Sequence, residues 1–157
     1  MKLSHVNKTG KASMVDVSKK DITERIASAR VTVKLNSEAF EAVLENKIKK
    51  GDVLAVANIA GINAAKKTSE LIPLTHQLNL RHVNIEFVLN SESSEIEITT
   101  EVKADDKTGV EMEALTAASV SALTIYDMCK SIDRKIEITD LRVIFKSGGK
   151  SVIFENE

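Results

Sequence analysis

The segment from Val110 to Lys130 constrains the fold most, because it is expected to be a helix with few large side chains. It reads VEMEALTAASVSALTIYDMCK and is rich in alanine, serine and threonine. Such a helix buries little apolar surface alone, so it must pack closely against another backbone. Charged residues stand near its two ends, namely Glu111, Glu113, Asp127 and Lys130. A core helix with charged ends explains this pattern as well as a functional helix does.

A second stretch of small residues, from Asp52 to about Leu71, is expected to be the helix that packs against the first. Gly61 interrupts it, and a glycine inside a helix costs about 1 kcal/mol relative to alanine, so something should pack tightly there. Pro73, the only proline in the chain, marks the boundary between this helix and the next segment. The small residues are Ala55, Ala57, Ala60, Gly61, Ala64 and Ala65.

Alternating apolar and polar residues predict the strands. Residues 81–89 and 95–102 alternate on either side of the loop NSESS, which predicts an antiparallel hairpin. Residues 30–35 and 136–145 predict two further strands. We expect one α+β domain over residues 1–157, an antiparallel sheet with helices on one face, whose ends, 1–13 and 147–157, are flexible.

Two shorter elements are expected from capping residues. Ser18 and Asp21 have the spacing of an N-cap and an acidic N3 residue, which predicts a short helix or turn. Ser37 is a second N-cap candidate, for an amphipathic helix that continues to about Asn46.

Composition excludes several function classes. The chain has 22 basic and 23 acidic residues, and its net charge of -1 argues against a nucleic-acid partner. With four Phe, one Tyr and no Trp, it lacks rings for base stacking. No apolar run approaches the ~20 residues of a spanning helix, so no membrane partner is expected. The polar N-terminus, MKLSHVNKTG, resembles no signal peptide, which predicts the cytoplasm.

No metal and no cofactor are expected. The single cysteine, Cys129, excludes an internal disulfide and an all-cysteine metal site. The three histidines, His5, His76 and His82, have no close metal-ligand spacing.

Several residues could carry chemistry, although each also has an ordinary structural explanation. Asp127 and Lys130 are three apart and share a helix face, which is also the spacing of a surface ion pair. His76 follows the proline bend, where it could exchange protons or only make a structural hydrogen bond. Lys50 precedes an expected helix start, where anions bind well.

The segment KSGGKS invites comparison with a phosphate-binding P-loop, but the comparison fails. Ile144 stands where that motif requires its first glycine, and no helix can follow in the few remaining residues. Lys146 and Lys150 could still neutralise phosphates, or the segment could be a polar tail.

Together these segments resemble one family. DKTGVEMEALTAASVSALTIYDMCK, KSGGKS, MVDVSKKDITER and KGDVLAVANIAGINAAKKTSELIPLTHQL are similar, in register, to the signature segments of cyclic pyranopterin monophosphate synthases. The resemblance implies a ferredoxin-like subunit that forms dimers, assembled into a hexamer as a trimer of dimers. It implies a lyase of molybdenum cofactor biosynthesis that converts 3',8-cyclo-7,8-dihydro-GTP to cyclic pyranopterin monophosphate and releases pyrophosphate. A radical-SAM GTP cyclase would supply that substrate.

The resemblance also implies roles for individual residues. Asp127, Lys50 and Lys130 match its catalytic positions. Its substrate-binding segments are matched by Leu74, Thr75, His76, Met112 and Glu113, and positions near the phosphates by Arg25, Lys146 and Lys150. The chain departs from the family in two places. Thr75-His76-Gln77 replaces the usual Cys-His-Pro, and Val152 replaces a common glycine.

Two other classes remain open. A regulator that binds a nucleotide or pterin without catalysis would keep the basic cluster but would not need Asp127. A structural, oligomer-forming domain would explain the small-residue helix but not the lysines. If the helix is continuous, Glu113 and Asp127 lie about 21 Å apart and within about 40° of one face. That separation predicts an active site built between two subunits.

Overall fold

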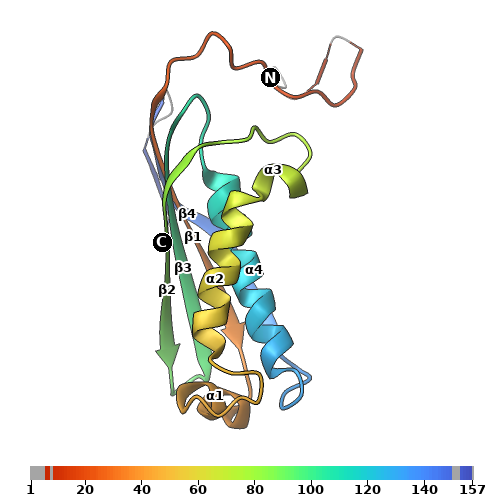
Figure 1. The fold of residues 1–157 in the computed structure, drawn as a ribbon, viewed down its shortest axis with the longest axis vertical. Helices are drawn as coiled ribbons and strands as arrows, with labels where there is room; N and C mark the ends of the chain where they lie inside the picture. The colour runs from red at the N-terminus through yellow and green to blue at the C-terminus, as the bar shows by residue number, and fades with distance from the viewer. Residues whose placement is uncertain (1–5, 8, 150–152, 157) are drawn as a thin grey trace.

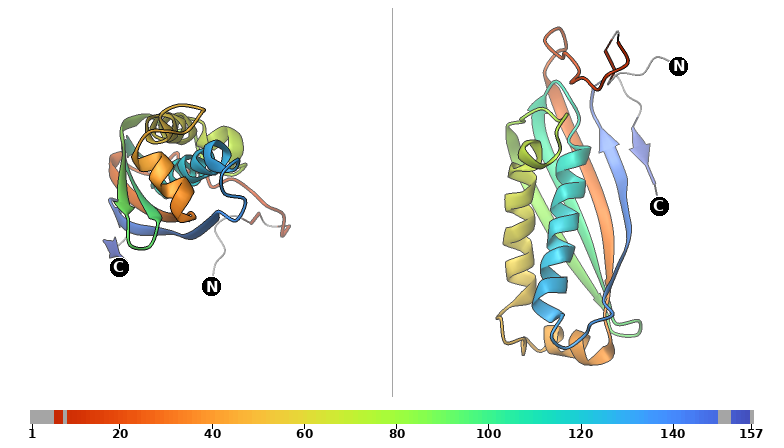
Figure 2. Two further views of the ribbon diagram at one scale, coloured as in Figure 1. Left: turned by 90° about the horizontal axis from the view of Figure 1, so that it is seen from below. Right: turned by 90° about the vertical axis from the view of Figure 1, so that its right-hand side faces the viewer.

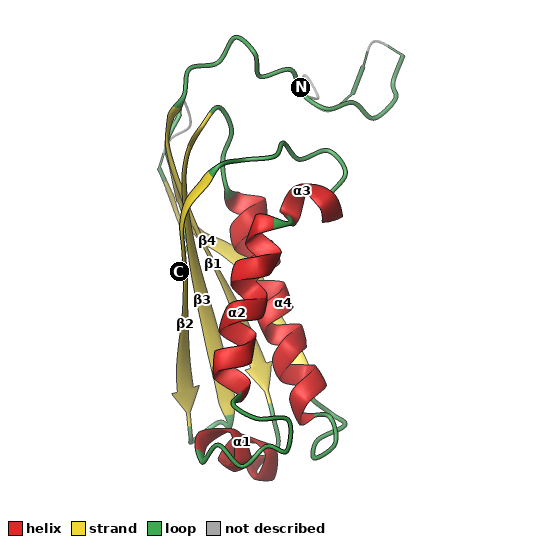
Figure 3. Ribbon diagram, viewed as in Figure 1, coloured by secondary structure: helices red, strands yellow, loops and turns green. Residues whose placement is uncertain are grey.

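An antiparallel sheet forms one layer of the molecule and two long helices form the other (Figure 1). The structure is a computed structural model that describes residues 6–7, 9–149 and 153–156. Figure 3 distinguishes its helices from its strands. In chain order the elements are β1 (Thr23–Lys34), α1 (Ser37–Leu44), α2 (Val53–Lys66), α3 (Thr68–Leu71), β2 (Leu80–Asn90), β3 (Glu95–Asp106), α4 (Glu111–Cys129), β4 (Glu137–Ser147) and β5 (Phe154–Glu155).

The sheet has the strand order β2-β3-β1-β4-β5, and all its pairs are antiparallel. Without the short β5, the order along the chain is strand, helices, strand, strand, helix, strand. This is the β-α-β-β-α-β arrangement of the ferredoxin-like fold. The expected α+β architecture, with helices on one face of an antiparallel sheet, is therefore confirmed (Figure 2).

The core lies between the sheet and the helices. Alternate residues of the two central strands point into it and are fully buried: Ala27, Ala29, Val31 and Val33 on β1, and Ile96, Ile98, Val102 and Ala104 on β3. Residues between them face the open side of the sheet and carry ion pairs, such as that of Arg30 with Glu97. This alternation fixes which face of the sheet receives α2 and α4.

The two long helices approach closely at Gly61, as the sequence predicts. A Cβ atom at Gly61 would overlap Ser121 Oγ and Ile85 Cδ1. Ser121 Oγ donates a hydrogen bond of 3.0 Å to the carbonyl oxygen of Ala57, across the helix pair. The small side chains therefore bring α2 and α4 together, and they set the position of both ends of α4.

Residues 18–20 form a turn, which is one of the two structures expected there. The Asp16 carboxylate stabilises it by accepting hydrogen bonds from Ser18 N and Ser18 Oγ. Some element boundaries differ from those expected. The first strand begins at Thr23 instead of Arg30, since its first half also pairs with β3. The inward-facing residues of that half are alanines, which are too small to give a clear apolar pattern in the sequence.

The helix boundaries differ in two further places. The N-cap of α1 is Asn36, whose Oδ1 accepts from Ala39 N at 2.8 Å, so Ser37 is the first helical residue. The helix expected from 52 to 71 breaks at Lys67 into α2 and α3. No helix within the described ranges has the length and apolar character needed to cross a membrane.

Candidate active site

Charged side chains gather at the two ends of α4. These two ends lie at opposite ends of the helix layer (Figure 1). We call the group at its C-terminal end, Lys50, Asp127 and Lys130, the lysine–aspartate cluster. We call the group near its N-terminal end, Lys20, Arg25, Lys107, Glu111 and Lys146, the basic cavity.

The lysine–aspartate cluster is held by three short contacts. Lys50 Nζ lies 2.8 Å from Asp127 Oδ2 and donates a second bond of 2.8 Å to the main-chain oxygen of Asp127. Lys130 Nζ lies 2.8 Å from Asp127 Oδ1. Lys50 precedes α2, which Asp52 caps, and the antiparallel packing of α2 on α4 brings it to the end of α4. The structure thus joins the three residues expected to be catalytic.

The electrostatics of this cluster favour its charged form. The hydrogen bond from Lys130, followed by that from Lys50, lowers the pKa of Asp127 to about 2. The same carboxylate raises the pKa of Lys130. The side chains are about half exposed, between 49% and 56%. The cluster therefore presents two ammonium groups around one fixed carboxylate, accessible to an anionic ligand.

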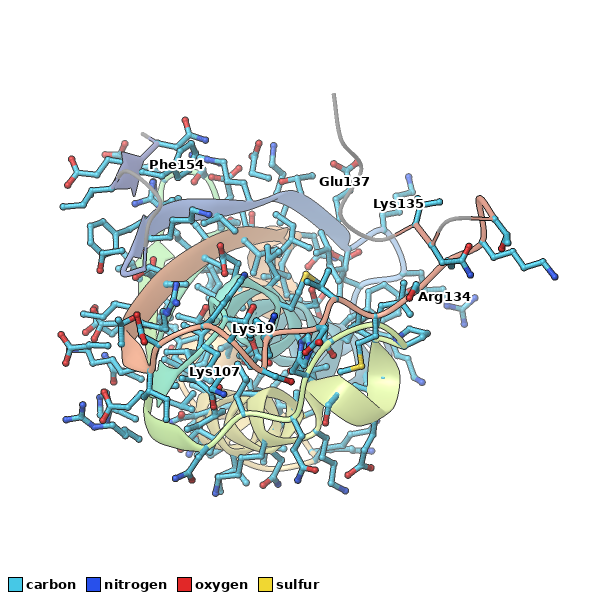
Figure 4. The ribbon with its side chains drawn as sticks, turned by 90° about the horizontal axis from the view of Figure 1, so that it is seen from above. Lys19, Lys107, Arg134, Lys135, Glu137 and Phe154 are labelled. Carbon is cyan, nitrogen blue, oxygen red and sulfur yellow. The ribbon has the colours of Figure 1, made fainter. Side chains whose placement is uncertain are left out.

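The basic cavity has a volume of about 180 Å³. Arg25 spans its wall, donating from Nε to the Asp106 carbonyl and from Nη2 to the Lys107 carbonyl, each at 3.2 Å. Lys107 Nζ donates to the Ser18 carbonyl at 2.9 Å. Figure 4 looks down on this end of the molecule, with Lys107 labelled above the helices. Lys146 extends from β4 and its Nζ lies 2.8 Å from Glu111 Oε1.

Glu113 stands in the first turn of α4, near this cavity, but it is buried with only 4% of its surface exposed. Burial raises its pKa to about 7, and the neighbouring carboxylates of Glu111 and Asp106 add to the rise, while a backbone hydrogen bond opposes it. Met112 beside it is half-buried. A carboxyl group with such a pKa can exchange a proton near neutral pH.

Leu74, Thr75 and His76 lie on the loop between α3 and β2, at the same end of the molecule as the start of α4 (Figure 1). All three are half-buried. His76 Nε2 is 2.8 Å from the Val15 carbonyl oxygen, so the histidine has a structural hydrogen bond to the segment before β1. Thr75 Oγ1 donates to the Ile72 carbonyl at 2.8 Å. The threonine side chain therefore stabilises the turn at the start of this loop.

Helix α4 is continuous from Glu111 to Cys129. The structure therefore keeps the lysine–aspartate cluster apart from Glu113 within one chain, by about 21 Å at 1.5 Å per residue. Arg25 and Lys146 do meet, in the basic cavity, whereas Lys150 lies outside the described residues.

Sequence reasoning did not anticipate that Lys20 and Lys107 line this cavity, or that Glu111 pairs with Lys146. No local pattern signals these positions, since they meet only when β3 and β4 both lie beside β1. Among the described residues, no group of three or more His, Cys, Asp or Glu side chains is placed to hold a metal ion.

The chain is similar to several known proteins. The model of the MoaC family matches residues 14–149. A cyclic pyranopterin monophosphate synthase from Syntrophomonas wolfei is 56% identical over 96% of this chain and 96% of its own. Another, from Thermoanaerobacter sp. (strain X514), is 52% identical over 100% of this chain and 99% of its own. A de novo designed protein with a ferredoxin fold aligns with a TM-score of 0.43 at 16% identity, covering 84% of this chain and 95% of that one.

Proposed function

Because this chain belongs to the MoaC family, we propose that it is a cyclic pyranopterin monophosphate synthase, a lyase of molybdenum cofactor biosynthesis. Its substrate is 3',8-cyclo-7,8-dihydro-GTP, and its products are cyclic pyranopterin monophosphate and pyrophosphate. The family match, which spans every residue of the lysine–aspartate cluster, carries this proposal. The cluster supplies the charge that a polyphosphate substrate requires.

The reaction makes two demands on the protein. Rearranging the rings moves protons at several atoms, which needs groups that can give and take them. Closing the cyclic phosphate forms a bond from a substrate oxygen to the α-phosphorus and breaks the bond to pyrophosphate. That step depends on cations placed around the phosphates more than on a covalent nucleophile.

The two ends of α4 suit these two demands. Lys50 and Lys130 provide ammonium groups whose positions are fixed by Asp127. Glu113 and His76 are the candidates for proton exchange, with Leu74, Thr75 and Met112 lining the substrate beside them. Arg25 and Lys146 contact the phosphates from the basic cavity, and we assign Lys150 to the same phosphates by its match to the family. A cavity of about 180 Å³ has room for phosphate groups but not for a whole nucleotide, so the base and sugar extend outside it.

We infer that one active site uses both ends of α4, taken from two subunits. Glu113 and Asp127 are about 21 Å apart but point to nearly the same side of the helix. A two-fold axis across α4 brings the start of one helix to the end of the other, and it builds two such sites in each dimer. Leu123 on α4 and Val56 and Ile59 on α2 expose apolar side chains on the helix layer, which a second subunit would cover. Three of these dimers would then form the hexamer that the family resemblance implies.

The chemistry of the substrate supports two further proposals, which are a functional partner and a compartment. A cyclised GTP derivative must be made by an enzyme that joins a base carbon to a sugar carbon of GTP. We propose a radical-SAM GTP cyclase as that functional partner and the cytoplasm, where GTP is available, as the compartment.

The direct test incubates the protein with the cyclised GTP intermediate and follows two products. We expect a cyclic pterin phosphate by mass spectrometry and an equal amount of pyrophosphate by an enzyme-coupled assay. The Asp127→Ala variant should still bind the intermediate but form neither product. Binding without turnover by the native protein would identify a regulator instead of an enzyme, and a protein that neither binds nor converts the intermediate would contradict the proposal.

A further inference from the structure

Glu111 is an acidic residue in the wall of a cavity that is otherwise basic. Four cationic side chains line the cavity, and Glu111 is the one acid among its described lining residues. Its Oε1 lies 2.8 Å from Lys146 Nζ, and the two side chains are 29% and 34% exposed. The carboxylate therefore holds the position that a phosphate oxygen would take on Lys146.

Gly109 allows Glu111 to adopt this conformation. A Cβ atom at position 109 would overlap Glu111 Oε2 and would lie 2.8 Å from its Cδ. The carboxylate thus packs directly over a residue that has no side chain. Because Glu111 is the first residue of α4, its negative charge is also favoured by the helix N-terminus.

A polyphosphate and Glu111 cannot both bind Lys146 at full strength. A phosphate group on Lys146 would lie within a few ångströms of the carboxylate, inside a volume of about 180 Å³. Like charges at that separation repel each other strongly where water is partly excluded. Glu111 is partly exposed, so its side chain can rotate towards solvent without any change in α4.

We propose that Glu111 is an internal competitor for polyphosphate. It binds Lys146 in the empty protein, is displaced by the phosphates of the substrate, and returns to Lys146 once pyrophosphate is no longer tethered to the nucleotide. Glu111 then weakens the affinity for free pyrophosphate and speeds its release, a step that limits turnover in many enzymes. The identity of the substrate rests on the proposed function, but the competition itself does not require turnover.

Isothermal titration of pyrophosphate into the full-length protein tests this proposal. The Glu111→Gln variant removes the charge and keeps the shape, so it should bind pyrophosphate about fivefold more tightly than the native protein. Glu101→Gln is the matched control. Glu101 pairs with Lys103 at 3.0 Å, with 38% and 37% exposure, on the open face of the sheet. This control should bind pyrophosphate as the native protein does.

Two further variants separate competition for Lys146 from general repulsion. In a Lys146→Met background, the Glu111→Gln change should no longer tighten pyrophosphate binding. Gly109→Ala should push the carboxylate away from Lys146 while keeping its charge, and it should therefore also tighten binding. A purely structural ion pair would instead lower the melting temperature of Glu111→Gln without changing its affinity for pyrophosphate.

Unchanged or weaker pyrophosphate binding by Glu111→Gln would overturn the proposal, as would equal tightening with and without Lys146. The outcome is independent of the proposed function. If the native protein converts the cyclised GTP intermediate but Glu111→Gln binds pyrophosphate normally, the inference fails and the function stands. If pyrophosphate binding responds as expected but no conversion occurs, the function fails and the inference stands.

Discussion

The surroundings at the two ends of α4 shift the pKa of a carboxyl group in opposite directions. At the C-terminal end, Asp127 is exposed, and the hydrogen bonds from Lys130 and Lys50 lower its pKa to about 2. At the N-terminal end, Glu113 is 4% exposed, and burial raises its pKa to about 7. Two acids on nearly the same face of one helix thus differ at neutral pH, because Asp127 is fully ionised whereas Glu113 is divided between its protonated and ionised forms.

This difference in pKa indicates that Asp127 and Glu113 have different roles. Pairs of acids whose surroundings separate their pKa values commonly divide between a fixed charge and a proton donor or acceptor. Asp127 remains ionised throughout the neutral range and serves to hold two ammonium groups. Glu113 changes its protonation near pH 7 and suits proton transfer. Substitutions at each end can test whether the two ends are indeed different and whether they act together.

The largest effect is expected from removing the cations of the lysine–aspartate cluster. Lys50→Ala and Lys130→Ala should each lower kcat by at least about 100-fold, because preorganised charge around a reacting phosphate is worth that much or more. Pyrophosphate release by folded protein at matched concentration measures this. Lys47→Ala is a suitable control, since Lys47 is an exposed lysine paired with Glu45. Near-normal product formation by either variant would remove that lysine from the catalytic machinery.

The second test asks whether the two ends meet across a subunit interface. Lys50 contacts Asp127 within one chain, so the complementing variant must come from the other end of α4. Asp127→Ala and Glu113→Ala should each be inactive alone. After random exchange in a dimer of shared sites, about a quarter of the sites have both groups intact. We expect about a quarter of native activity to return on mixing.

Mass spectrometry of intact assemblies, with one variant isotopically labelled, verifies that the subunits have exchanged. A mixture that exchanges completely but stays inactive would show that Glu113 and Asp127 do not combine from two subunits. An active monomer would rule out any shared site.

A smaller effect is expected from His76. His76→Ala should lower kcat/KM about tenfold or more, if the side chain transfers protons as general acid–base groups do. His82→Ala, an exposed histidine on β2, should change little. Because His76 Nε2 bonds the Val15 carbonyl, a structural role alone is the competing explanation. A variant with a lower melting temperature but native kcat/KM would establish that role.

The smallest effect concerns stability and comes from the pKa of Glu113. Its pKa is raised from 4.5 to about 7 in the folded protein, which corresponds to roughly 3 kcal/mol at most. The folded state holds the proton more tightly, so stability falls as pH rises from 4.5 through about 7. Glu113→Gln should therefore gain several degrees in melting temperature at pH 8 and little at pH 4, at matched protein concentration. An equal shift at both pH values would mean that Glu113 is not neutralised by burial.

The alternating strands were the most predictable part of the fold. Residues 81–89 and 95–102 show their buried faces through isoleucine, valine and phenylalanine. The first half of β1 was missed because its inward residues, Ala27 and Ala29, are too small to mark a face. The N-cap of α1 was displaced by one residue, since Asn36 and Ser37 are both good capping residues.

The candidate site was less predictable from local pattern. The spacing of Asp127 and Lys130 indicates contact, but Lys50 reaches Asp127 only through the packing of α2 on α4. Resemblance to a family identified Lys50 where periodicity could not. The pairing of Glu111 with Lys146 depends on strand order, which no short motif encodes, and the pKa of Glu113 depends on burial at a helix end that reads as polar in the sequence.

One buried side chain has a practical consequence. Cys129 is the only cysteine of the chain and is fully buried, and burial, reinforced by Asp133, raises its pKa to about 11. Thiol-directed dyes react with the thiolate, so the native protein should behave towards them as if it had no cysteine. A single cysteine introduced on the surface would then accept a fluorophore selectively. Energy transfer between donor-labelled and acceptor-labelled chains could track the assembly in real time without any change to its core.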